Sequence, residues 1–145
     1  MATIKRLPSK GNLYSFNKNW KHYFFGCEKG LIITDTKFRL IKCIDYTSIV
    51  ISIEIVSEKL AIIASYSEGL HILDLITFEI IFRNAFKNKF CVIELIKYLK
   101  SMKLIAISSI ATNGLWFATL NLNNPPQIEI NNTVMYKDSS FTNVC

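Results

Sequence analysis

The stretch SEGLHILDLITFEII, residues 67–81, has the pattern of a turn, an apolar strand, a short turn and a second strand. Its Gly-Leu pair recurs twice, so that three segments align: CEKGLIITD with Gly30, YSEGLHILD with Gly69 and ATNGLWFAT with Gly114. The glycine spacings of 39 residues (30 to 69) and 45 residues (69 to 114) lie in the range of repeats built from four short strands. The sequence therefore predicts three units of one repeat rather than an isolated hairpin.

The composition favours strands throughout the chain. Half of the 145 residues are hydrophobic, and Ile, Val, Phe and Tyr dominate that set. Branched and aromatic side chains fit a pleated, half-buried surface. We therefore expect a mostly β fold made of antiparallel four-stranded units, in which Gly30, Gly69 and Gly114 occupy the turns between second and third strands, where positive φ is easiest for glycine.

Hydrophobic patterns within each unit predict how its strands are covered. Residues 49–56 alternate, with Ile49, Ile51, Ile53 and Ile55 on one face, which predicts a strand with one dominant buried face. Residues 60–64 and 104–107 are instead apolar at nearly every position. Such runs suit strands that are covered on both faces by neighbouring sheets.

One segment has two readings. Five apolar residues recur at helical spacing, and three lysines fall on the opposite side: Val92, Leu95, Ile96, Leu99 and Met102, with Lys97, Lys100 and Lys103. The repeat alignment instead places a first strand over residues 90–96, followed by an extended turn. We expect the strand, because a helical period over so few residues arises easily by chance.

The order of turn, LAIIAS, turn with Gly69, LHILD, a short turn and FEIIF resembles the WD-repeat class of β-propellers. That family usually ends the third strand in Trp-Asp; here Asp35 and Asp74 keep the acid without the tryptophan, Thr119 keeps neither, and the family's Gly-His pair is missing. The resemblance covers about residues 13–130. It implies an N-terminal arm (1–11), three blades (about 12–48, 49–89 and 90–130) and a C-terminal edge strand or tail (131–145).

A narrower resemblance is to the phosphoinositide-binding propellers called PROPPINs, through the Phe16-Asn17 start of the first unit. Those proteins hold lipid head groups with a Phe-Arg-Arg-Gly motif. This chain has only Phe82-Arg83-Asn84, so we carry no lipid-binding residue over from the family.

The formal net charge of +6 is the remaining functional signal. Basic residues fall in three loose groups, of which the second and third hold the possible anion contacts: Lys5, Arg6 and Lys10; Arg83, Lys87 and Lys89; and Lys97, Lys100 and Lys103. They predict either a solubilising surface or contact with nucleic acid, anionic lipid or an acidic protein. Because no basic run is dense and no aromatic pattern is interleaved with one, the solubilising surface is the simpler interpretation.

Nothing in the sequence assembles a catalytic or cofactor site. It lacks a phosphate-binding glycine loop, a metal-ligand cluster and a nucleophile elbow, so we expect no enzyme activity, no cofactor and no metal. His22 is expected in solvent and His71 within an apolar strand. Scattered cysteines (Cys27, Cys43, Cys91 and Cys145), no secretory signal and no uninterrupted apolar span predict a reduced chain in the cytoplasm or nucleus.

Three units are too few for a closed propeller, which has about four to eight blades. A partial propeller exposes broad apolar faces, and such faces usually mark interfaces. We therefore expect a non-catalytic interaction scaffold, completed by a protein partner or by self-association. The alternative is an anion-binding propeller that contacts phosphoinositide membrane or nucleic acid through its basic loops.

Overall fold

The computed structural model describes residues 6–85, 93–109, 114–123 and 125–134, and this part of the chain contains strands and no helix. The first sheet consists of β1 (Leu13–Lys18), β2 (His22–Cys27), β3 (Gly30–Asp35) and β4 (Leu40–Asp45). The second consists of β5 (Val50–Ile55), β6 (Leu60–Ser65), β7 (Gly69–Asp74) and β8 (Ile80–Ala85). The third consists of β9 (Ile93–Leu99), β10 (Leu104–Ser109), β11 (Gly114–Asn121) and β12 (Gln127–Val134).

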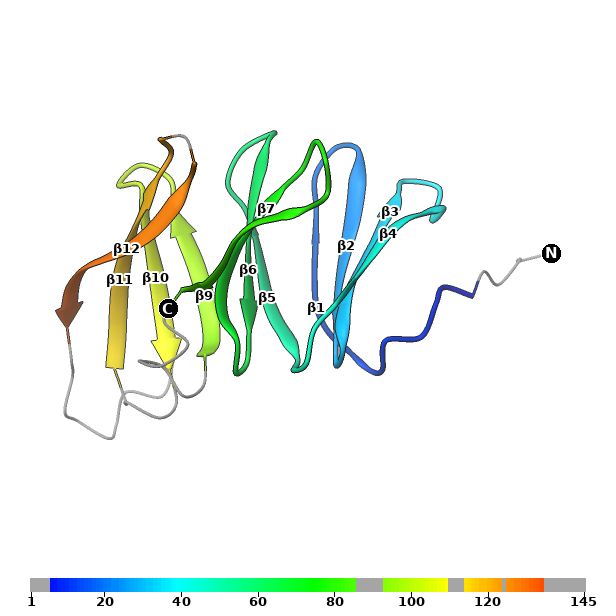
Figure 1. The fold of residues 1–145 in the computed structure, drawn as a ribbon, viewed down its shortest axis with the longest axis horizontal. Helices are drawn as coiled ribbons and strands as arrows, with labels where there is room; N and C mark the ends of the chain where they lie inside the picture. Colours follow the sequence, from blue (N-terminus) through cyan, green and yellow to red (C-terminus); the bar gives the residue numbers. More distant parts are fainter. Residues whose placement is uncertain (1–5, 86–92, 110–113, 124, 135–145) are drawn as a thin grey trace.

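Each sheet is antiparallel, with its four strands in chain order, so the expected mostly β fold of four-stranded antiparallel units is confirmed. The sheets stand side by side in the order first, second, third (Figure 1). Contacts between neighbouring sheets are concentrated on their first strands, β1 with β5 and β5 with β9. The first strands therefore form the inner edge of the stack.

The second and third strands of each sheet pair in one shared register. Six consecutive pairs run from His22 with Asp35 to Cys27 with Gly30 in the first sheet. Matching sets end at Ser65 with Gly69 and at Ser109 with Gly114. The glycines that align in sequence thus occupy equivalent positions in the three sheets.

Two apolar cores separate the three sheets. The first core joins the first two sheets through residues such as Phe24, Ile33, Ile53 and Ile63, which are at most 4% exposed. The second core joins the second and third sheets through Ile62, Ile72, Ile96, Ile105 and Ile107. Successive residues of β6 alternate between the two cores, which explains its continuous apolar run.

Hydrogen bonds from side chains to backbone groups also connect the inner strands. Ser15 Oγ donates to the Val50 carbonyl at 2.7 Å, and Asn17 Nδ2 donates to the Ile53 carbonyl at 2.7 Å. Between the next two sheets, the Tyr98 N–H donates to Glu54 Oε2 at 3.1 Å. These bonds fix the position of each inner strand against the next.

The predicted phase of the alternating segment is wrong. Register shifts between Val50 and Ser52, so that Val50 and Ile53 both enter the first core while Ile51 packs against the second. An irregularity of this kind adds a residue between paired positions and reverses the alternation. No single face of β5 is the buried one.

The segment with two readings is a strand, and the helical alternative is wrong. Strand β9 runs from Ile93 to Leu99, shifted toward the C-terminus from the predicted 90–96. Pairing along the whole of β10 outweighs the short helical period. Strand β12 likewise continues past the predicted boundary at residue 130 to Val134.

Candidate interaction surfaces

Asp35 and Asp74 organise equivalent turns between third and fourth strands. Asp35 Oδ1 accepts the N–H groups of Lys37 and Arg39 at 2.8 and 2.9 Å. Asp74 Oδ1 accepts those of Ile76 and Thr77 at 2.7 and 3.1 Å. The hydrogen bond from the Arg39 backbone N–H, together with that residue's side chain, lowers the pKa of Asp35. Both aspartates therefore have structural roles in turns.

The third sheet has its own version of this turn, which the sequence alignment missed. Strand β11 continues beyond Thr119 to Asn121, whose Oδ1 accepts the Asn123 N–H at 3.0 Å. An asparagine two residues past the aligned position thus takes the place of the aspartate. The polar run NLNN after the apolar strand is the signal that could have located it.

The three aligned glycines do not share one backbone conformation. Gly69 has a positive φ of 90°, as a turn glycine should. Gly30 has no such φ; instead, a Cβ there would lie 2.6 Å from the Ile44 carbonyl oxygen. Gly114 begins β11 opposite Ser109. At Gly30, therefore, close approach of strand β4 is the reason for glycine.

Gly26 is a further constrained glycine, which the sequence analysis did not identify. A Cβ at this position would lie 1.9 Å from Ser15 Oγ and 2.7 Å from the Val50 carbonyl oxygen. Those two atoms form the hydrogen bond that links β1 to β5. The close packing of the first two sheets therefore depends on the absence of a side chain at residue 26.

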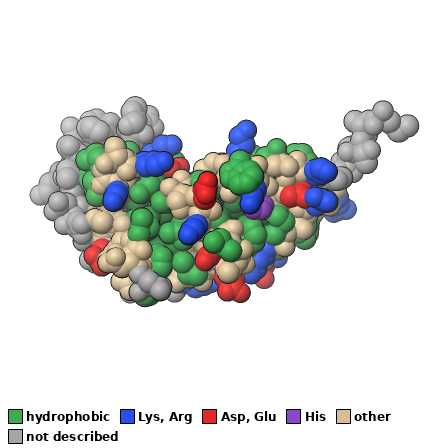
Figure 2. Space-filling view, turned by 90° about the horizontal axis from the view of Figure 1, so that it is seen from above, with side chains coloured by type: hydrophobic (Ala, Val, Ile, Leu, Met, Phe, Trp, Pro, Cys, Tyr) green, Lys and Arg blue, Asp and Glu red, His purple; other side chains and the backbone are tan. Residues whose placement is uncertain are grey.

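The basic residues named from the sequence do not form one site. Arg83 lies in β8 beside an open cleft that Lys42 and Glu79 also line. Lys97 lies in β9 with its Nζ 3.9 Å from Glu54 Oε1, and Lys100 and Lys103 are exposed in the turn that follows. Lys87 and Lys89 lie outside the described residues. Figure 2 shows basic side chains spread along the molecule, with acidic ones between them.

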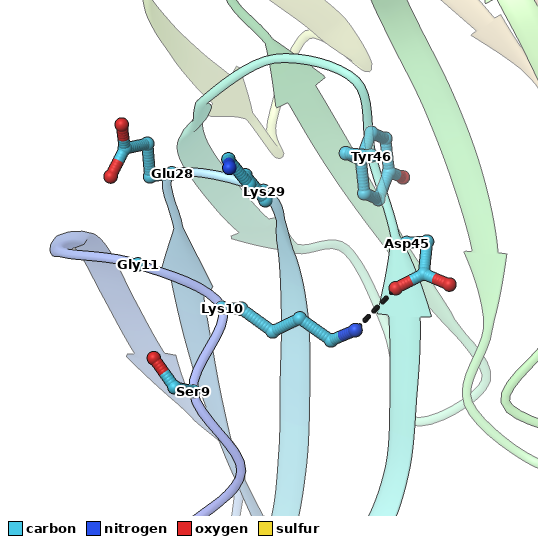
Figure 3. A pocket seen from close by; sticks show the side chains of 7 residues that line it. All are labelled: Ser9, Lys10, Gly11, Glu28, Lys29, Asp45 and Tyr46. Atoms are coloured by element: carbon cyan, nitrogen blue, oxygen red, sulfur yellow. Dashed lines mark hydrogen bonds and ion pairs between the residues drawn. The ribbon is translucent and has the colours of Figure 1, made fainter.

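A second open cleft of about 510 Å³ lies at the edge of the first sheet. Lys10, from the segment before β1, forms an ion pair with Asp45 at the end of β4 (Figure 3). Glu28, Lys29 and Tyr46 also line the cleft. Because charges of both signs line it and its central lysine is already paired, the cleft has no strong preference for an anion.

The two histidines have structural surroundings. His71 is fully buried, with Nδ1 3.1 Å from the Tyr46 hydroxyl and its ring stacked on that phenol. Burial raises the pKa of Tyr46. His22 is half-buried, with its ring 4.9 Å from that of Phe78, so the expectation that it lies in solvent is wrong. Within the described part of the chain, no histidine, cysteine or acidic residues gather into a metal-binding group.

The first sheet has an outer face that points away from the first core. The face opposite the first core carries, by strand alternation and pairing, Phe16, Tyr23, Phe25, Ile32 and Cys43. The Phe16 ring lies 6.0 Å from that of Tyr23 and 5.3 Å from that of Phe25, and the Tyr23 ring lies 5.1 Å from that of Phe38. Phe16 is 51% exposed, whereas Tyr23 and Phe25 are half-buried and Ile32 is 4% exposed. We call this aromatic surface the first-sheet outer face.

The third sheet has a corresponding face at the other end of the stack. By the same alternation, the surface opposite the second core carries Leu95, Leu104, Ala106, Leu115 and Phe117, together with Lys97, which pairs with Ala106, and Ser108, which pairs with Leu95. Leu95 is 43% exposed, whereas Ala106 is 7% exposed. We call this the third-sheet outer face. Both outer faces are mainly apolar.

Comparison with known proteins adds no family to these observations: no protein-family model and no curated protein matches the chain. In the portion that the structure describes, no helix has the length and apolar character needed to cross a membrane.

Proposed function

We propose that this chain is a non-catalytic protein-interaction module, a partial WD-like β-propeller whose two outer faces dock against protein. The observation that carries the proposal is the first-sheet outer face, where Phe16 is 51% exposed and Tyr23 and Phe25 are half-buried, although the same register positions in the other two sheets are buried. Exposed contiguous apolar patches of this kind mark interaction surfaces.

The internal architecture supports this proposal. Each of the two cores forms where one sheet covers the next, and the second sheet is covered on both faces. The first and third sheets therefore each have one covered face and one outer face. A partner that presents an apolar sheet would extend the same packing, and aromatic residues such as Phe16 and Tyr23 are enriched in the buried centres of interfaces.

The experiment compares proteins retained by tagged chains in extract of their own cells, after nuclease treatment and a high-salt wash. Phe16→Lys and Leu95→Lys place a charge on one outer face each, at side chains exposed enough to accept it. Ile76→Lys, at a turn residue that is 66% exposed, adds the same charge elsewhere and is the matched control.

The proposal expects a protein in fixed stoichiometry with the wild-type chain and with Ile76→Lys, and its loss from at least one face variant. Retention that is equal in all four chains would overturn it. Retention of nucleic acid or anionic lipid only, at low salt and independent of the outer faces, would favour the basic loops instead.

A further inference from the structure

The shared register allows side-chain sizes to be compared at equivalent positions of the three sheets. One position on the second strand of each sheet faces the next sheet in the stack. This position is Phe24 in the first sheet, Ile62 in the second and Ala106 in the third. The residue before it points to the opposite face of its sheet, toward the previous sheet in the stack. This residue is Tyr23 in the first sheet, Ala61 in the second and Ile105 in the third.

In the two cores, these positions compensate each other in size. The large Phe24 shares the first core with the small Ala61. The second core combines Ile62 with Ile105, two side chains of intermediate size. Such compensation is expected because interiors are close-packed and tolerate swaps that conserve total volume.

The two positions that face away from both cores are opposite extremes of the two series. Ala106, on the third-sheet outer face, is the smallest residue of the first series, and Tyr23, on the first-sheet outer face, is the largest of the second. Phe16 and Phe25 continue the trend, since their equivalents on covered faces are isoleucines: Ile53, Ile63, Ile96 and Ile107. The first-sheet outer face is thus enlarged at Phe16, Tyr23 and Phe25, and the third-sheet outer face is reduced at Ala106 but enlarged at Phe117, whose equivalents are Ile33 and Ile72.

We propose that the partner of these faces is a second copy of this chain, with the third-sheet outer face of each copy packed on the first-sheet outer face of the other. Ala106 of one copy then accommodates Tyr23 of its partner, as Ala61 accommodates Phe24 within the chain. This inference rests on the proposed function and names its partner. Each contact joins the third-sheet outer face of one copy to the first-sheet outer face of the other. The two contacts are therefore equivalent, and together they cover all four outer faces.

The number of sheets that a closed propeller contains favours an assembly of two copies of the chain. Closed propellers contain about four to eight four-stranded blades. One chain supplies three sheets, two supply six and three supply nine, so a pair is the only whole number of copies inside that range. Closure by a two-fold axis is also the commonest symmetry of soluble oligomers.

Sedimentation equilibrium of the purified full chain tests the inference. We expect a limiting mass of twice the 16.6 kDa chain, with no larger species as concentration rises, because a closed ring has no free outer face. Ala106→Phe fills the small position and Tyr23→Ala empties the large one. Each should raise the dissociation constant of the dimer by about tenfold or more.

The double variant exchanges the two sizes within one chain and should restore much of the association. A circular dichroism spectrum of each variant checks that its strands remain. If Ala106→Phe does not fold, the contact is tested from the first-sheet outer face instead. Two samples are then measured: Tyr23→Ala alone, and an equimolar mixture of Tyr23→Ala with the wild-type chain. In that mixture, the hybrid should associate more weakly than the wild-type pair.

Three results would overturn the inference: a wild-type chain that is monomeric at all concentrations, an open series of larger species, or single variants that associate as wild type does. A monomeric chain that still retains another protein through Phe16 or Leu95 would leave the proposed function intact and refute self-closure. A monomeric chain without such retention would refute both.

Discussion

At the residue scale, the contact between the first two sheets depends on Gly26. The Gly26→Ala variant places a methyl group against Ser15 Oγ and the Val50 carbonyl oxygen. We expect a loss of about 1–3 kcal/mol in the free energy of unfolding, because overpacking displaces backbone and not only a flexible side chain. Urea titration followed by circular dichroism measures it.

A second substitution separates the two clashes at this position. Ser15→Gly in the Gly26→Ala background removes the hydroxyl but leaves the Val50 carbonyl, so stability should return in part only. A Gly26→Ala chain as stable as wild type would show that the sheets are not held as closely as described.

His22 gives the fold a dependence on pH. Burial, followed by the nearby Lys21 charge, lowers its pKa from 6.5, while Asp35 acts in the opposite direction. A histidine whose pKa is lower in the folded state binds its proton more weakly there than in the unfolded state. Protonation therefore lowers the free energy of unfolding. The contribution of His22 to stability should therefore be constant above about pH 7 and become unfavourable as the pH drops through about 6.5.

The urea midpoint at about pH 7.5 and about pH 5.5 measures this dependence. His22→Gln should reduce the fall between these two values, and Lys21→Gln should reduce it less, because it removes only the second cause. An unchanged fall in His22→Gln would assign the dependence to other groups.

The residues that could be predicted were those whose signal is local. Asp35 and Asp74 follow an apolar strand and precede a turn, which is a pattern that the sequence displays directly. Gly26 could not be recognised, because its constraint comes from Ser15 and Val50, which are far from it in the chain. His22 was misplaced for the same reason, since Phe78 belongs to another sheet.

At the element scale, the aspartate turns hold third and fourth strands in register. Asp74→Ala removes the acceptor of two backbone N–H groups, and we expect a loss of about 1 kcal/mol in the free energy of unfolding. Asp74→Asn keeps an accepting oxygen and should retain most of the stability. If the alanine and asparagine variants unfold at the same urea concentration, the turn does not depend on this acceptor.

The strands themselves show how far pattern reasoning reaches. The three glycine-aligned hairpins could be predicted, since their pairing follows the repeat without interruption. The phase of β5 could not, because the shift between Val50 and Ser52 leaves no mark on the hydrophobic pattern. Nor could the extension of β11 to Asn121 be seen, since it lies two residues past the repeat.

At the scale of the whole molecule, charge distinguishes protein docking from anion binding. Each chain carries a formal charge of +6, so two copies repel each other at low ionic strength. Raising the salt concentration from about 0.05 M to about 0.5 M should therefore tighten self-association, because salt screens this repulsion. Binding to nucleic acid weakens over the same range. Sedimentation at both concentrations decides between them, and dissociation at high salt would contradict apolar docking.

The three four-stranded units could be predicted from the spacing of the glycines. The opposite side-chain sizes at Tyr23 and Ala106 could not, because they become visible only when the sheets share a register and their faces are assigned. Sequence spacing therefore predicts the units, whereas the partner that we propose for their outer faces rests on packing.

The most direct test of the central claim, that both outer faces are buried against protein, is hydroxyl-radical footprinting of the full chain isolated intact from its own cells. Phe16 and Leu95 lie on the outer faces, whereas Trp20 and Met102 are exposed turn residues that serve as internal controls. We predict that Phe16 and Leu95 are protected while Trp20 and Met102 are oxidised. Oxidation of Phe16 and Leu95 at the rates expected from the intrinsic reactivity of each side chain and its exposure in the single chain would contradict the account.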